Sequence, residues 1–160
     1  MGANDLSTAL WRQRELLELL LFKFEEQQLL LAAGRTRWLP YSTREVEAIA
    51  RRLKTAGLSL IVSTADVAGE LGLPADARLR DVASAAPGAW KEIFGSHLVA
   101  LIALTNDIRA IRNGNEKLLR YALRSTQETL NLIDDSPSTY SADGTTKHAL
   151  KQAGLVDASL

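Results

Sequence analysis

Four apolar residues recur at every seventh position near the start of the chain, and this repeat constrains the fold more than any other feature. They are Leu10, Leu17, Phe24 and Leu31. A repeat of seven keeps one seam of an α-helix facing a partner helix. Other leucines spread apolar surface around the rest of the same helix: Leu16, Leu19, Leu29 and Leu30. A helix this apolar must be covered on more than one side, and the cover could be other helices of the chain, a second subunit or a client.

The first helix is expected over about residues 5–33. Asp5 or Ser7 can cap its N-terminus, because their side-chain oxygens accept the free amide protons of the first turn. Gly34 follows the apolar repeat directly. Helices often end at a glycine in the left-handed conformation, so Gly34 predicts the C-terminal end of this helix.

A second helix is expected from Ser42 to near Gly72. The run Ser-Thr-Arg-Glu that begins at Ser42 is a capping-box pattern, in which Ser42 accepts the amide proton of Glu45 and Glu45 accepts that of Ser42. Pro74 lies just beyond the expected end of the helix. Proline is common there, since it cannot continue a helix.

The third part of the chain begins with a short connector, residues 75–86, in which Leu79 and Val82 suit one or two helical turns. A continuous apolar seam at helical spacing then runs over residues 89–133. If this helix is unbroken it is roughly 65 Å long at 1.5 Å per residue. The sequence leaves open a kink at Gly114.

The last stretch, residues 135–160, is polar and aperiodic over its first half and predicts a flexible C-terminal arm. Residues 1–134 then form one helical domain. The expected fold is all-α: an elongated antiparallel helical hairpin or three-helix bundle with long coiled-coil-like helices.

Charge gives no sign of a nucleic-acid or membrane-surface partner. The chain has 19 basic and 19 acidic residues, and either partner would need an excess of Lys and Arg on one face. A local basic cluster lies in residues 35–54, but Glu45 and Glu47 sit inside it. We interpret this cluster as a solvated helix face.

The chain has no cysteine, which excludes disulfides, thiol catalysis and zinc–thiolate sites. Its most apolar run, residues 16–24, is interrupted by Glu18 and Lys23 and is too short to span a bilayer. No signal peptide is apparent at the N-terminus. The expected compartment is the cytoplasm, without membrane insertion.

Catalytic and cofactor-binding patterns are missing from the sequence. Of the two histidines, His97 lies on the apolar seam of the last helix and His148 in the arm. His97 is therefore interpreted as a seam histidine satisfied by a neighbour, and His148 as unsuited to a rigid site. Glu25 and Glu26 are adjacent and point in different directions on a helix. With no metal-ligand or nucleotide-binding motif, we expect a binding protein without metal or cofactor and not an enzyme.

Three stretches, in this order, resemble FlgN-type flagellar export chaperones, and the opening residues 10–17 resemble the high-GC Gram-positive branch of that family. The stretches are Phe-Glu-Glu-Gln-Gln-Leu-Leu-Leu at residues 24–31, Asn113-Gly114-Asn115 followed by Leu118-Leu119, and Thr-Tyr-Ser-Ala-Asp-Gly-Thr at residues 139–145. The resemblance covers nearly the whole chain in length and helix order, but about residues 56–90 match little beyond being helical.

The resemblance implies a role, partners and site residues. It implies that the chain holds the hook–filament junction proteins FlgK and FlgL export-competent and delivers them to the export gate. The client-binding residues that it implies lie on the last helix: Asn115, Leu118, Leu119, Ala122, Leu123, Leu130 and Ile133. Those for the export-gate protein FlhA lie in the arm: Tyr140, Asp143 and Gly144.

Other interpretations use the same residues. A structural or regulatory coiled-coil protein that only dimerises would also need these leucines, and a homodimer is compatible with both roles. Leu118 and Leu119 could pack on the first helix, and Asn115 could be a polar residue that sets helix register. A dimerisation module has no use for residues 140–144, so the arm discriminates between the two roles. A small helical enzyme is disfavoured by the missing acid–base residues.

Overall fold

The computed structural model describes residues 2–134. In chain order its elements are α1 (Ala3–Ala32), the 3-10 turn η1 (Thr36–Trp38), α2 (Leu39–Glu70), α3 (Leu79–Ala85) and α4 (Ala89–Asp134). No strand occurs in this part of the chain, which confirms the all-α fold. The predicted arm, with Tyr140, Asp143 and Gly144, lies outside the described residues.

The chain divides after Ala122 into two units. The first unit contains α1, α2, α3 and the residues of α4 up to Ala122. The described part of the second unit is residues 123–134, which are helical and exposed throughout. Each unit is described by itself.

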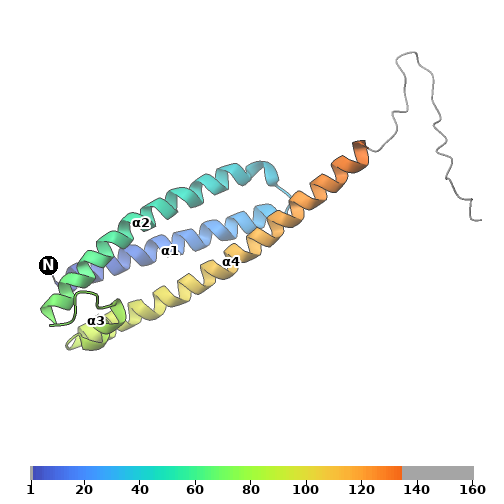
Figure 1. Cartoon of the computed structure of the whole chain (residues 1–160). Coiled ribbons are helices and arrows are strands. Elements are labelled where there is room, and N and C mark those ends of the chain that lie inside the picture. Colours follow the sequence, from blue (N-terminus) through green and yellow to red (C-terminus); the bar gives the residue numbers. More distant parts are fainter. Residues whose placement is uncertain (1, 135–160) are drawn as a thin grey trace, which may run out of the picture. The chain divides into compact units, whose positions relative to one another are not determined.

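Two buried clusters hold the first unit together, and in both of them α1 contributes residues of the heptad repeat. The larger cluster consists of Leu6, Leu10, Val67, Ala68, Val82, Ala83, Ala86 and Phe94. The smaller consists of Leu20, Phe24 and Ile49, with Ile108 and Ile111 of α4 packed against it. Figure 1 shows α1, α2 and the part of α4 in the first unit running side by side, with the short α3 beside the end of α1 where the chain begins. Two of the four residues of the apolar repeat, Leu10 and Phe24, therefore belong to the core of a helical bundle.

Most helix ends lie where the sequence predicts them. Gly34 and Gly72 follow α1 and α2 with φ of 65° and 68°, the left-handed conformation that glycine adopts without strain. The connector contains α3, as expected. The last helix, α4, is a single element of 46 residues.

The expected N-terminal caps differ in detail. The first helix begins earlier than predicted, and Asp5 caps it by accepting a hydrogen bond from the Gly2 backbone N–H at 3.1 Å. The predicted capping box at Ser42 is wrong, because α2 already begins at Leu39 with Pro40 in its first turn. Proline suits that position, where the amide has no partner in any case. Ser42 is consequently inside the helix and buried.

Candidate functional site

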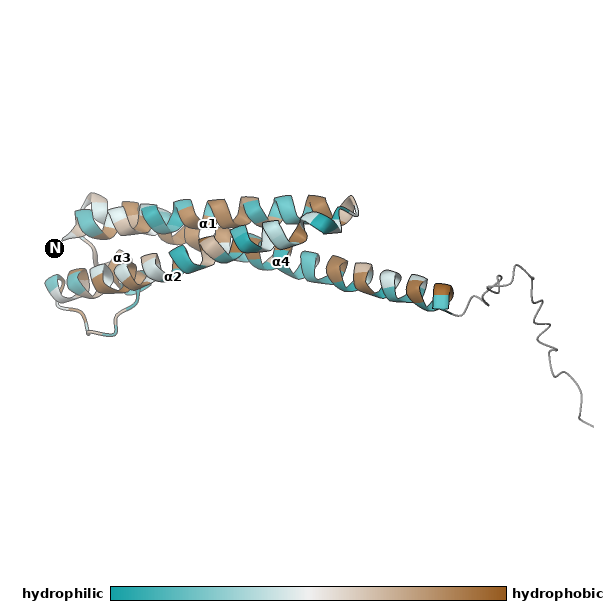
Figure 2. Cartoon of the chain, turned by 90° about the horizontal axis from the view of Figure 1, so that it is seen from above, coloured by the Kyte–Doolittle hydropathy of each residue, from teal (hydrophilic) through white to brown (hydrophobic). Residues whose placement is uncertain are grey.

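The apolar residues predicted to bind a client lie on α4, on both sides of the division after Ala122. In the first unit Leu119 is exposed, whereas Leu118 and Ala122 are half-buried. In the second unit the other three predicted residues are exposed by half or more: Leu123 63%, Leu130 50% and Ile133 63%. Figure 2 shows hydrophobic and hydrophilic residues alternating along the last turns of α4. Four predicted leucines and isoleucines are therefore accessible to a partner.

Asn115 behaves differently from the other predicted residues, since it is buried. Its Nδ2 donates a hydrogen bond to the Phe24 backbone oxygen at 2.8 Å and a longer one to Gln27 Oε1 at 3.4 Å. A charge-neutral hydrogen bond of this kind contributes about 1 kcal/mol net. Asn115 thus ties α4 to α1, which is the register-setting role left open by the sequence, and its contact with a client stays a prediction.

A groove of about 290 Å³ lies beside Asn115, between α1, α2 and α4. Its lining combines apolar and polar side chains from all three helices: Gln27, Leu31, Leu39, Thr43, Arg112, Asn115, Glu116 and Leu119. Of the site residues predicted on α4, this groove brings Asn115 and Leu119 together. The sequence analysis did not single out Leu39, Thr43 or Arg112 as site residues, because the meeting of three helices leaves no periodic signal in the sequence.

The glutamate–glutamine stretch of α1 lies at this same junction. Lys23 pairs with Glu26 of its own helix at 2.6 Å and joins α1 to α2 through Glu45 at 2.9 Å. Hydrogen bonding to Glu26, and then to Glu45, raises the pKa of the Lys23 ammonium. Gln27 donates to Thr43 Oγ1 at 3.4 Å. The stretch therefore joins helices as well as lining the groove.

Gly114 of α4 faces α1 at this junction, and its surroundings leave room for an ordinary contact. A Cβ added there would lie 3.4 Å from Gln28 Nε2. A glycine in mid-helix costs about 1 kcal/mol relative to alanine. The hydrogen bond from Asn115, the next residue, offsets part of that cost.

His97 is buried, with 3% of its surface exposed, on the face of α4 that packs on α1. Trp11 meets its ring edge-on at a centroid distance of 4.9 Å, and the Arg14 guanidinium lies 4.7 Å from the Trp11 ring centroid. Burial lowers the pKa of His97, and the positive charge of Arg14 lowers it further. Within the described chain, His97 Nδ1 has no hydrogen-bond partner. The predicted seam position is confirmed, but no neighbour within residues 2–134 satisfies this nitrogen, although a satisfying neighbour was expected for the ring.

We expect His97 to make the fold less stable in mild acid. A histidine whose pKa is lowered by folding is protonated more readily in the unfolded chain. Its stabilisation is therefore complete above about pH 6.5 and is lost below that value, as the pH falls through the lower pKa of the folded state. The free energy of unfolding should fall between about pH 7.5 and pH 5, by at most about 1.4 kcal/mol per pH unit for this one proton. Urea unfolding of the wild type and of His97→Gln over this range measures the effect. The variant should show a shallower slope, and equal slopes would contradict this account.

Within residues 2–134, no group of three or more His, Cys, Asp or Glu side chains is arranged to hold a metal ion. Among the helices of those residues, none has the length and apolar character needed to cross a bilayer.

Comparison with known proteins gives one match. The family model described as FlgN protein matches residues 1–148. No curated protein and no solved structure matches the chain. The matched range contains the whole described bundle and also the residues Tyr140, Asp143 and Gly144.

Proposed function

Because the chain belongs to the FlgN family of flagellar export chaperones, we propose that it binds the hook–filament junction proteins FlgK and FlgL in the cytoplasm and delivers them to the export gate. The family is one of chaperones and not of enzymes. Its role in flagellar assembly implies binding to flagellar proteins in general. The proposal adds the two clients, the delivery step and the residues that carry them out.

The exposed apolar residues of α4 are the observation that carries this proposal. Leu119, Leu123, Leu130 and Ile133 are all exposed, although a leucine or isoleucine gains about 1.5–3 kcal/mol when it is fully buried. Along the sequence they are separated by polar residues such as Arg120 and Glu128. An amphipathic helix of a client would cover the apolar side chains and leave the polar ones in water.

The groove between α1, α2 and α4 offers a further contact for a client. Leu119 lines it together with Leu31 and Leu39, while Arg112 and Glu116 offer charges of both signs. A client side chain of modest size fits a volume of about 290 Å³. The groove would then take one apolar anchor of the client.

Delivery is proposed to use the arm, through Tyr140, Asp143 and Gly144. A tyrosine can bury its ring in a pocket of FlhA and still hydrogen-bond through its hydroxyl. Ordering an extended segment costs conformational entropy, so such a contact is weak and reversible. A chaperone that must release its client and leave the gate needs that reversibility.

Co-purification tests both parts of the proposal. The chain should form a stable complex with FlgK or FlgL from the same organism, and the complex should bind the cytoplasmic part of FlhA. Tyr140→Ala should keep the client complex and lose FlhA binding, whereas Tyr121→Ala, an exposed tyrosine on α4, serves as the matched control for FlhA binding. A well-folded chain that binds neither FlgK nor FlgL would exclude the client role. FlhA binding that survives Tyr140→Ala would exclude the role given to the arm.

A further inference from the structure

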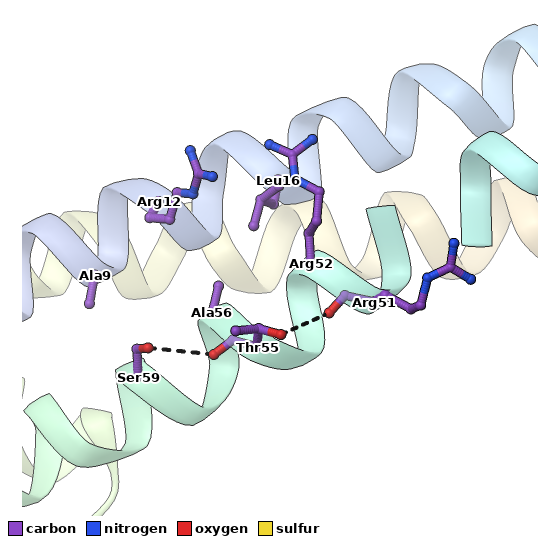
Figure 3. Close-up of a pocket in the computed structure, with 8 residues that line it drawn as sticks. All are labelled: Ala9, Arg12, Leu16, Arg51, Arg52, Thr55, Ala56 and Ser59. Carbon is purple, nitrogen blue, oxygen red and sulfur yellow. Dashed lines mark hydrogen bonds between the residues drawn. The ribbon is translucent and has the colours of Figure 1, made fainter. Parts of the chain in front are cut away.

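One face of the hairpin formed by α1 and α2 carries two grooves that contain no residue of α4. We name it the outer hairpin face. The first groove, of about 420 Å³, is lined by Ala9, Arg12, Leu16, Arg51, Arg52, Thr55, Ala56 and Ser59. In Figure 3 the side chain of Arg52 extends from α2 towards α1, and the ribbon of α4 lies behind both helices. We name this the basic groove.

The basic groove has an unbalanced positive charge. Three arginines line it and no carboxylate does. Arg12 has one ion pair, with Glu15 at 3.8 Å, and both side chains of that pair are more than half exposed. Arg51 and Arg52 form no ion pair within residues 2–134. The groove therefore favours an occupant that carries carboxylates next to small or apolar side chains.

The second groove lies near the other end of the hairpin and has the opposite character. It measures about 340 Å³ and is lined by Glu26, Leu29, Leu30, Trp38, Tyr41, Ser42 and Glu45. Its lining contains two carboxylates, which share the ammonium of Lys23, and no cationic side chain. The guanidinium groups of Arg37 and Arg44 lie beside it, 4.8 and 5.7 Å from the ring centroids of Trp38 and Tyr41. Leu29, Trp38 and Tyr41 are exposed large apolar residues. We name this the acidic groove.

Heptad spacing places both grooves along the same side of the hairpin. On α1, Arg12 of the basic groove and Glu26 of the acidic groove are two heptads apart, with Leu19 midway. On α2, Thr55 and Tyr41 are two heptads apart, with Ala48 midway. Residues seven apart face the same way in helices that pack as coiled coils.

The two midpoints also lie at one level of the hairpin. Leu20, which follows Leu19, and Ile49, which follows Ala48, are packed in the same buried cluster. A two-fold axis that lies in the plane of this face and crosses both helices at Leu19 and Ala48 therefore places each groove opposite the other groove of a second copy. A surface that is complementary to itself about such an axis is the mark of a two-fold dimer interface.

We propose that the outer hairpin face binds a second copy of this chain, antiparallel, about a two-fold axis at Leu19 and Ala48. The basic groove of each copy then faces the acidic groove of the other. Arg12 meets Glu26 of the second copy, and Arg52 meets Glu45 of the second copy. The helices α1 and α2 of both copies together form an antiparallel four-helix bundle, which buries Leu29 and Tyr41. This face is separate from the residues of α4 proposed for the client.

Charge-reversal variants test the proposal, with dimerisation measured by sedimentation velocity over a range of concentrations. The wild type should dimerise, and Arg12→Glu/Arg52→Glu should raise the dimer dissociation constant by at least about tenfold, because like charges then face each other. Adding Glu26→Arg/Glu45→Arg to that variant should restore the dimer. Circular dichroism checks that every variant is folded. Arg109→Glu/Lys117→Glu, which makes the same charge change on exposed positions of α4, should leave the dimer intact.

Cross-linking fixes the orientation of the two copies. The chain has no cysteine, so single cysteines can be placed at will and joined with a short thiol-reactive cross-linker. Ala48→Cys should link to itself across the axis. Tyr41→Cys should not, since the two sites would lie about 21 Å apart, but it should link to Thr55→Cys when the two proteins are mixed.

Three results would overturn the proposal. They are a chain that is monomeric at every concentration, a dimer that the charge reversals leave unchanged, and self-linking of Tyr41→Cys. If the basic groove binds an acidic partner protein instead, the chain alone should be monomeric at every concentration. None of these assays contains a client, so their failure leaves the proposed chaperone role untouched.

Discussion

Replacing Leu123 and Leu130 with aspartate is expected to weaken binding of FlgK or FlgL by about 100-fold or more. Both side chains are at least half exposed, and a partner that buries them gains about 1.5–3 kcal/mol from each. Losing two such contacts costs about 3 kcal/mol or more, which is about two factors of ten in the dissociation constant. Aspartate adds the cost of removing a carboxylate from water. Isothermal titration calorimetry with purified client measures the change.

The matched control is Leu58→Asp/Ile61→Asp, which places the same two charges at exposed apolar positions of α2. It should bind client within about threefold of the wild type, because surface substitutions away from the site usually change free energies by no more than about 0.5 kcal/mol. Equal weakening by both pairs would mean that the loss reflects added charge in general. Unchanged binding by the α4 pair would move the client surface elsewhere on the chain.

Phe94→Ala is expected to lower the free energy of unfolding by about 3–5 kcal/mol. Phe94 is fully buried and stacks on Trp90 with a ring centroid distance of 5.4 Å. It joins α4 to the cluster made by α1, α2 and α3, so truncation leaves a cavity where four helices meet. The cost includes the lost transfer of the ring from water and the cavity left behind. Urea or thermal unfolding followed by circular dichroism gives the value.

Val99→Ala provides the comparison within the same helix, five residues further on. Val99 is an exposed residue of α4, so its truncation should change the stability by no more than about 0.5 kcal/mol. If Phe94→Ala cost as little as Val99→Ala, α4 would not be docked on the bundle through its N-terminal part.

The sequence predicted the long helices well because their signals are local. The heptad repeat of α1 places Leu10 and Phe24 in the buried clusters, and Gly34 ends the helix in the conformation that only glycine adopts easily. The start of α2 was predicted wrongly for an equally physical reason. Pro40 is favourable in the first turn, and it allows the helix to begin before the pattern at Ser42.

The candidate site was predicted only in part. The exposed leucines of α4 could be named from the family resemblance, but the burial of Asn115 could not. Its hydrogen bond to the Phe24 backbone joins residues 91 positions apart in the chain. The same holds for the link between Gln27 and Thr43. Such contacts depend on how the helices pack together. The pattern of residues within one helix does not identify the residue that lies opposite on another helix.

The exposure of every residue in 123–134 has a consequence for how that segment fluctuates. No buried side chain holds these twelve residues in place, and an isolated helix of this length is marginal in water. Its backbone amides should therefore exchange with deuterium through local fraying, orders of magnitude faster than those beside Phe24 or Phe94, whose exchange requires wider unfolding. A bound client would slow the exchange of this segment most of all. Part of the client's binding enthalpy would then come from holding these last turns of α4 against fraying.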